Sequence, residues 1–204
     1  MIDDEAADLS AAERREYFRI RDQVVLEYRP VDVAEAAFVA EEIQRDMPDR
    51  FTVASRFEAS SRIMNRLTHT FASKMPDLAR YLKSMDDKLN YMARLFVMEA
   101  IDLHERIPQV VTLSGGGICF GVDREYPEET LLELRIVLLP SMTGILCVGK
   151  VVHCQQAFPG LSGSPWNIAV EYRDIREPDR DLLVKHIMNR QTEELRRQRY
   201  PDEE

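Results

Sequence analysis

Long hydrophobic runs are missing from this sequence. Apolar stretches such as residues 136–139 and 145–148 are four residues long, whereas a membrane-spanning helix needs about 20. The first ten residues, MIDDEAADLS, are acidic, but a secretory signal begins basic and continues apolar. We therefore expect no membrane span and a cytoplasmic location.

Cysteine is scarce and odd in number. The three residues Cys119, Cys147 and Cys154 contain no C-x-x-C pair, so a disulfide framework is not expected in a reducing compartment. Cys147 and Cys154, with His153 beside them, could suggest a metal site. They lie in an apolar stretch with the alternation of a strand, so we interpret them as buried strand residues and expect no metal.

Positive charge is in deficit. The chain has 27 Lys and Arg against 36 Asp and Glu, a net charge of −9, which argues against a general nucleic-acid or anionic-membrane surface. Residues 14–21, RREYFRIR, are the exception, because they carry four arginines and one glutamate. Any anion that this protein binds is expected there.

Catalytic signatures are also missing. The four histidines stand apart, without an H-E-x-x-H motif. The segment GLSGS at residues 160–164 lacks the final glycine of G-x-S-x-G, and no Walker lysine follows a glycine loop. We therefore expect no enzymatic activity and no catalytic residues.

Glycine is absent from residues 32–106 and confined to residues 115–163, which divides the chain into parts with two different sequence patterns. Residues 32–107 have helical periodicity and predict three helices, at about 33–46 after an Asp32 N-cap, at 52–73, and at 76–105 from Pro76. Residues 1–31 and 108–204 predict a strand at 24–28, five strands within 108–173 and a helix at 178–199. In that helix, Leu182, Leu183, Ile187 and Leu195 are expected to pack on the sheet. Short successive strands indicate an antiparallel barrel or sandwich.

The third expected helix carries the clearest pattern in the chain. Its apolar residues recur in steps of four and three, and only Glu99 interrupts the series. This seam consists of Leu78, Leu82, Met85, Leu89, Met92, Phe96 and, beyond Glu99, Leu103. One interpretation is an intramolecular pair with the helix at 52–73, and the other is a coiled-coil seam between protomers. Both can coexist in a bundle.

Two short motifs stand out among the strands. The first is RREYFR at residues 14–19, just before the first strand, and the second is TLSGGG at residues 112–117, between two strands. Each alone is unremarkable, since arginine clusters are usually solvated and glycines are common in turns.

Together these motifs resemble the PilZ domain, the bacterial receptor for cyclic di-GMP. That family pairs R-x-x-x-R before the first strand with [D/N]-x-S-x-x-G on a later strand and turn. Arg15 and Arg19 match the first motif, and Ser114 and Gly117 match the second. The closing strand and C-terminal helix, AVEYRDIREPDRDLLVKHIMNRQTEELRR, are similar too. The resemblance covers roughly residues 12–31 and 108–199.

The resemblance implies an α+β protein with a six-stranded antiparallel barrel, a C-terminal helix and a non-catalytic receptor function. Cyclic di-GMP would be bound by Arg15 and Arg19 with Arg14 assisting, and by Ser114 and Gly117. The inserted helical segment, residues 32–107, resembles that of an atypical subgroup that assembles into tetramers through a heptad-bearing helix. The expected partners are the nucleotide, further copies of the chain and a protein effector that the sequence does not name.

Thr112 departs from the family pattern. It stands where the family has Asp or Asn, so an acceptor for the donor edge of guanine is missing. Weakened binding is the expectation, because the arginines are kept. The alternative is a nucleotide-independent oligomeric scaffold with the same fold.

Overall fold

The computed structural model describes residues 18–45, 49–100, 102, 106–157 and 163–199. The strands are β1 (Ile20–Val31), β2 (Gln109–Leu113), β3 (Gly117–Val122), β4 (Leu131–Leu138), β5 (Thr143–Gln156) and β6 (Trp166–Ile175). The helices are α2 (Val33–Gln44), α3 (Val53–Phe71), α4 (Pro76–Ala100) and α5 (Glu177–Arg199). None of these helices combines the length and hydrophobicity of a membrane-spanning segment.

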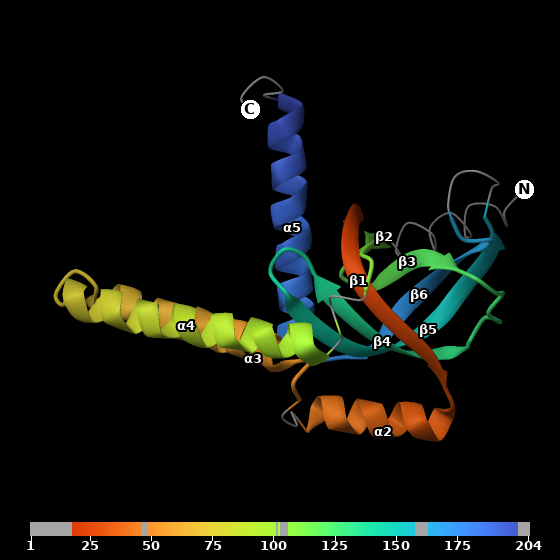
Figure 1. Cartoon of the computed structure of the whole chain (residues 1–204), viewed down its shortest axis with the longest axis horizontal. Coiled ribbons are helices and arrows are strands. Elements are labelled where there is room, and N and C mark those ends of the chain that lie inside the picture. Colours follow the sequence, from red (N-terminus) through yellow and green to blue (C-terminus); the bar gives the residue numbers. More distant parts are fainter. Residues whose placement is uncertain (1–17, 46–48, 101, 103–105, 158–162, 200–204) are drawn as a thin grey trace, which may run out of the picture.

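The strands form a closed antiparallel barrel in the order β1-β2-β3-β6-β5-β4 (Figure 1). β1 closes it by pairing twice. Its first half pairs with β2, from Ile20 opposite Leu113, and its second half pairs with β4, as far as Val31 opposite Leu131. The α+β fold with a six-stranded barrel and C-terminal helix is therefore confirmed.

Alternation along the strands fills the barrel interior. On β3, Ile118, Phe120 and Val122 are buried, while the intervening residues are partly exposed on the outside. This period of two places successive side chains on opposite faces of the barrel wall. The largest fully buried interior side chains are Leu113, Leu132, Leu134, Ile136, Leu138, Ile145, Ile168 and Leu183.

β1 begins earlier than the expected strand at 24–28. The reason is Asp22, a buried charged residue that interrupts the apolar pattern. Its carboxylate is satisfied by α5: His186 Nε2 lies 2.6 Å from Asp22 Oδ2, and Arg190 Nη2 donates to Oδ1 at 2.7 Å. Partners this distant in the chain leave no signal near residue 22.

The helix α2 begins as expected. Asp32 Oδ1 accepts from the backbone N–H of Glu35 at 2.8 Å, and Glu35 accepts in return from the N–H of Asp32 at 3.1 Å. This capping box satisfies two of the N–H groups that a helix start leaves without intrahelical partners. The buried face of α2, with Val39 and Ile43, packs against Val148 on the barrel.

The helices α3 and α4 form a long hairpin that projects from the barrel (Figure 1). At its base, Phe51 is fully buried with Ala93 and Val97 of α4 against Val25 and Val137 of the barrel wall. This second core anchors the hairpin to the outside of β1 and β4.

The helix α4 ends at Ala100, short of the expected residue 105. Asp102 has a φ of 46°, the left-handed conformation that terminates many helices and that Asp adopts more readily than most residues. Leu103, the last expected seam position, lies outside the described residues.

The helix α5 covers the barrel with its first half only. Leu182, Leu183 and Ile187 are buried against the barrel as expected, whereas Leu195 is exposed. The expectation that Leu195 packs on the sheet was wrong, because the second half of α5 extends beyond the barrel (Figure 1).

Candidate functional site

The two matched motifs are positioned by neighbouring strands. Arg19 directly precedes β1, and Ser114 and Gly117 lie at the junction of β2 and β3. β1 and β2 pair in antiparallel register there, with Ile20 opposite Leu113. The structure thus brings Arg19 to the same end of the barrel as the turn. Arg14 and Arg15 lie outside the described residues.

The β2–β3 turn is built by Ser114. Its backbone N–H donates to the carbonyl of Gly117 at 2.9 Å, and its hydroxyl donates to the same carbonyl at 3.1 Å. The N–H of Gly117 is 3.0 Å from Ser114 Oγ, which accepts from it. The hydroxyl therefore holds the turn itself, a role that the motif comparison alone did not predict.

Glycine is required at position 117. A Cβ there would lie 2.4 Å from the carbonyl oxygen of Val170 on β6, a separation that side-chain carbons do not tolerate. The requirement comes from close approach of the two backbones.

The other two turn carbonyls are held from outside the turn. Gly115 O accepts from Arg180 Nη1 of α5 at 2.7 Å, and Gly116 O accepts from the backbone N–H of Tyr172 of β6 at 2.9 Å. The turn is thus fixed to three elements, β3, β6 and α5.

Thr112 lies on the outer face of the barrel. It is partly exposed, between the buried Val111 and Leu113, and it stands opposite Arg21 on β1 and Cys119 on β3. Side chains opposite each other on one face have Cβ atoms about 4.5–5.5 Å apart. Thr112 and Arg21 therefore share one surface.

Arg19 contributes to the same surface. Burial raises the pKa of the Cys119 thiol, and the positive charge of Arg19 acts in the opposite direction, which places that guanidinium near Cys119. No carboxylate among the described residues pairs with Arg19 or Arg21. These two cations remain available to an anion over the outer face of β1, β2 and β3, which we call the arginine face.

Arg21 was not among the residues selected from the motifs. The signal was present, since Arg19 and Arg21 are two residues apart and an extended chain places such neighbours on one side. Arg180 had no comparable signal, because its contact with Gly115 joins distant parts of the chain.

Asp22 anchors β1 immediately behind the arginine face. Burial by itself would raise the pKa of its carboxyl, but hydrogen bonds from Arg190 and His186 lower it, and the net pKa lies below its ordinary value. The charged carboxylate thereby holds α5 against β1, the strand that directly follows Arg19.

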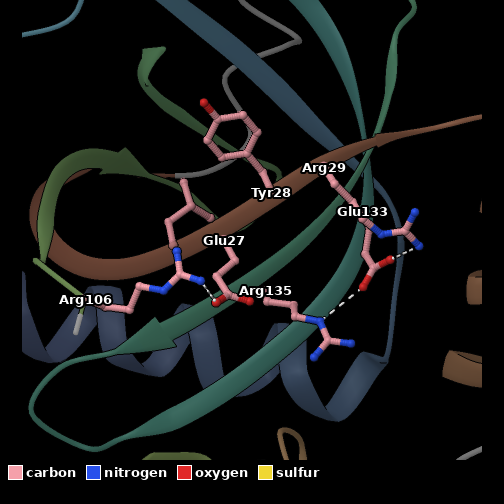
Figure 2. Close-up of a pocket in the computed structure, with 7 residues that line it drawn as sticks. Glu27, Tyr28, Arg29, Arg106, Glu133 and Arg135 are labelled. Atoms are coloured by element: carbon pink, nitrogen blue, oxygen red, sulfur yellow. Dashed lines mark hydrogen bonds and ion pairs between the residues drawn. The ribbon is translucent and has the colours of Figure 1, made fainter. Parts of the chain in front are cut away.

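A second site, a pocket of about 450 Å³, lies over β1 and β4 (Figure 2). Its cations face carboxylates of the protein: Glu133 accepts from Arg29 at 2.5 Å and from Arg135 at 3.1 Å. Glu27 lies 2.6 Å from Arg106. This internal pairing leaves less positive charge for a bound anion than the arginine face offers.

The seam residues of α4 are exposed along the hairpin. Leu78, Met85, Leu89, Met92 and Phe96 are 39–54% exposed, and Leu82 is half-buried. We call the line of these six residues the apolar seam. Such a continuous exposed stripe is typical of an interaction surface.

The pairing of α4 with α3 uses a different face. Ala79, Ala93 and Val97 are buried, and Ser61 of α3 donates to Asp86 at 2.6 Å and accepts from Asn90 at 2.9 Å. The intramolecular pair therefore exists without covering the apolar seam, which leaves that seam for another partner.

The cysteines and histidines do not gather into a site. Cys147 is fully buried inside the barrel, whereas His153 is exposed. Within the described residues, no group of three or more His, Cys, Asp and Glu side chains could hold a metal ion. Residues 160–162 of the GLSGS segment lie outside the described residues.

Comparisons with known proteins place these features in a family. Residues 89–189 match the model of the PilZ domain. A tetrameric PilZ-domain protein from Xanthomonas campestris, self-assembled through a helical bundle, has a similar structure, with a TM-score of 0.56, 11% identity and coverage of 89% of this chain and 92% of that one. The MotI/DgrA inhibitor of motility from Bacillus subtilis is also similar, with a TM-score of 0.44, 14% identity and coverage of 88% and 52%.

No curated protein matches the sequence. The PilZ match begins within α4 and ends within α5, so it leaves out β1 and its arginines. It nevertheless takes in β2 to β6, including the turn that Ser114 builds. On this match and on the fold, the chain belongs to the PilZ domain family.

Proposed function

We propose that this protein is a non-catalytic receptor that binds cyclic di-GMP on the arginine face. The observation that carries the proposal is the convergence of Arg19, Arg21 and the Ser114 turn on one outer surface, where no described carboxylate neutralises the two arginines. Arg14 and Arg15 precede Arg19 by a few residues in the sequence, and we propose that they also bind the nucleotide.

The chemistry of the ligand suits these groups. Cyclic di-GMP carries two phosphates and two guanines. Guanidinium groups form two-pronged hydrogen bonds with phosphate oxygens or with the O6/N7 edge of guanine, and their planes stack on bases. Backbone N–H groups of a glycine turn add anion-binding donors. Lysine would supply charge without the fork or the stack.

We further propose that the apolar seam assembles the protein into an oligomer, a tetramer by analogy with the Xanthomonas protein. Its support is the exposure of five large apolar side chains in a line on a helix whose other face is already occupied by α3. Other copies of this chain offer the same seam, so a bundle would bury all of them together.

Calorimetric titration with cyclic di-GMP tests the receptor function. Arg15→Ala and Arg19→Ala should each weaken binding by about 10–150-fold, which corresponds to the roughly 1.5–3 kcal/mol of a hydrogen bond to a charged group. Arg19→Lys should recover little. Arg45→Ala, on the exposed end of α2, serves as the control and should bind like the wild type.

Two results would contradict the proposal. If the wild type does not bind, the alternative of a nucleotide-independent oligomeric scaffold stands in its place. If Arg19→Lys binds like the wild type, the arginine face acts only through general electrostatics. For either function, we propose a protein effector, which the sequence does not name, as a further partner.

A further inference from the structure

The turn between β2 and β3 contains three consecutive glycines, and each of their carbonyls is held. The Gly115 carbonyl accepts from Arg180, the Gly116 carbonyl from the N–H of Tyr172, and the Gly117 carbonyl from Ser114. Glycine lacks a Cβ, so peptide planes between glycines reorient at little steric cost. These external donors therefore decide which way the peptide groups face.

Among the described residues, Arg180 alone donates to the Gly115 carbonyl and so sets the orientation of the Gly115–Gly116 peptide. In a planar trans peptide, the carbonyl of one residue and the N–H of the next point in opposite directions. The Arg180 guanidinium draws the Gly115 carbonyl toward α5 with a 2.7 Å hydrogen bond. The Gly116 N–H consequently points away from α5.

That N–H differs from the N–H groups of Ser114 and Gly117, which are bonded within the turn. The Gly117 N–H is already bonded to Ser114 Oγ at 3.0 Å. Within the part of the chain that the structure describes, no group accepts from the Gly116 N–H. An amide donor that is fixed in direction and has no internal acceptor suits an anionic oxygen.

We propose that Arg180 is a positioning residue that fixes the Gly115–Gly116 peptide, so that the Gly116 N–H donates to a phosphate oxygen of the bound nucleotide. This proposal rests on the proposed nucleotide-binding function of the arginine face. Without Arg180 the peptide can turn over, and the Gly115 carbonyl then presents a negative dipole to the phosphate.

Arg180→Gln tests the orientation first, in the protein without nucleotide. The Gly116 amide nitrogen resonance in an NMR spectrum reports whether the preceding carbonyl accepts a hydrogen bond. We expect it to shift in Arg180→Gln, whose side chain is shorter and uncharged, and to return part of the way in Arg180→Lys, which keeps a long side chain with a charged donor. Lys185→Ala, on the same helix but paired with Glu58 at 3.6 Å, should leave it unchanged.

Titration with cyclic di-GMP then tests the consequence. Arg180→Gln should bind about 5–10-fold more weakly, the loss of roughly one hydrogen bond, with Arg180→Lys intermediate and Lys185→Ala unchanged. Urea unfolding identifies any variant whose loss of binding comes from lost stability. A folded Arg180→Gln protein that binds like the wild type, or that leaves the Gly116 resonance in place, overturns the proposal.

The two measurements separate this inference from the function on which it rests. If the wild type fails to bind cyclic di-GMP, the receptor function and the role of the Gly116 N–H toward phosphate both fall. The control of the peptide by Arg180 is still decided by the resonance in the nucleotide-free protein. If the wild type binds and the Arg180 variants bind like it, the receptor function stands and the positioning role is wrong.

Discussion

At the scale of single residues, Thr112 is the position through which we propose that the arginine face contacts a guanine base. Its hydroxyl accepts one hydrogen bond, whereas a carboxylate or amide accepts from more than one donor of guanine. The structure places Thr112 partly exposed and opposite Arg21. A larger polar side chain at this position therefore has access to a ligand on that surface.

Thr112→Asn should tighten cyclic di-GMP binding by about 5–30-fold, which corresponds to roughly 1–2 kcal/mol. Thr112→Asp should gain less, because Arg21 stands opposite and competes for the carboxylate. Calorimetry on both variants measures the gain. Thr112→Val keeps the shape and removes the hydroxyl, so equal affinities of the Val, Asn and wild-type proteins would mean that position 112 does not read the base.

Asp22 is the residue on which the attachment of α5 to β1 depends. Its lowered pKa means that the folded state favours the carboxylate. That stability is fully present above the ordinary carboxyl pKa of about 3.9 and is lost as the pH falls through the lower pKa of the folded state. The cluster therefore supports the fold at neutral pH and weakens below about pH 4.

Asp22→Asn should lower the free energy of unfolding by about 2–3 kcal/mol at neutral pH, because it removes the charge that His186 and Arg190 face. Urea denaturation between about pH 3 and 7 measures both the loss and its pH dependence. Asp87→Asn, an exposed residue of α4, is the control. If Asp22→Asn has the stability of the wild type throughout, the cluster contributes nothing to the fold.

The residues found from sequence were those with a local signal. Ser114 and Gly117 carry a motif, and the structure brings them to the same end of the barrel as Arg19. Arg180 and the partners of Asp22 could not be found in this way, because their contacts, such as Arg180 with Gly115, join segments that only the closed fold brings together.

At the scale of elements, the attachment of the hairpin to the barrel depends on a close approach at the start of β5. Gly144 lies beneath the backbone that leads into α3, and a Cβ there would be 2.1 Å from the carbonyl oxygen of Phe51. Phe51 is itself fully buried at the base of the hairpin. No side chain can be inserted here without moving α3 outward.

Gly144→Ala should therefore cost about 1–3 kcal/mol of stability, the usual range for overpacking a core. Thermal or urea unfolding measures it. Gly163→Ala is a matched control, since nothing lies within 4 Å of a Cβ at that position, and it should behave like the wild type. Equal stability of the two variants would show that the backbone near Phe51 moves to admit the methyl group at no cost in stability.

The positions of helices and strands can be predicted from sequence where residues at the element's own end determine them. The N-cap at Asp32 and the first-turn proline at Pro76 place two helix starts. The end of α4 and the start of β1 were misplaced, the first because Asp102 adopts a left-handed conformation and the second because Asp22 is compensated from α5.

At the scale of the whole molecule, the apolar seam is a hydrophobic surface that a single chain leaves exposed to solvent. Leu89 lies in its middle and is 48% exposed, on a helix face beside the one that contacts α3 through Asp86 and Asn90. Leu89→Asp would place a charge in the interface of the proposed bundle, where desolvation is costly.

Leu89→Asp should dissociate the oligomer while the barrel remains folded. Sedimentation velocity on both proteins measures the change, and circular dichroism checks the fold. Lys88→Asp, on the neighbouring exposed position, introduces the same charge outside the seam and should leave the assembly intact. A wild type that is already monomeric at micromolar concentrations contradicts the assembly.

The double pairing of β1 has a consequence for how the chain folds. β1 is separated in sequence from the other five strands by α2, α3 and α4, yet it must contact β2 and β4 to complete the barrel. Until it arrives, β2 and β4 present unpaired edges that can recruit other chains. Such long-range closure is slow, whereas helical hairpins form quickly because their contacts are local. An early α3–α4 hairpin would hold β1 close to the other five strands, so that β1 pairs with β2 and β4 sooner. The unpaired edges of β2 and β4 would then be exposed to aggregation for a shorter time.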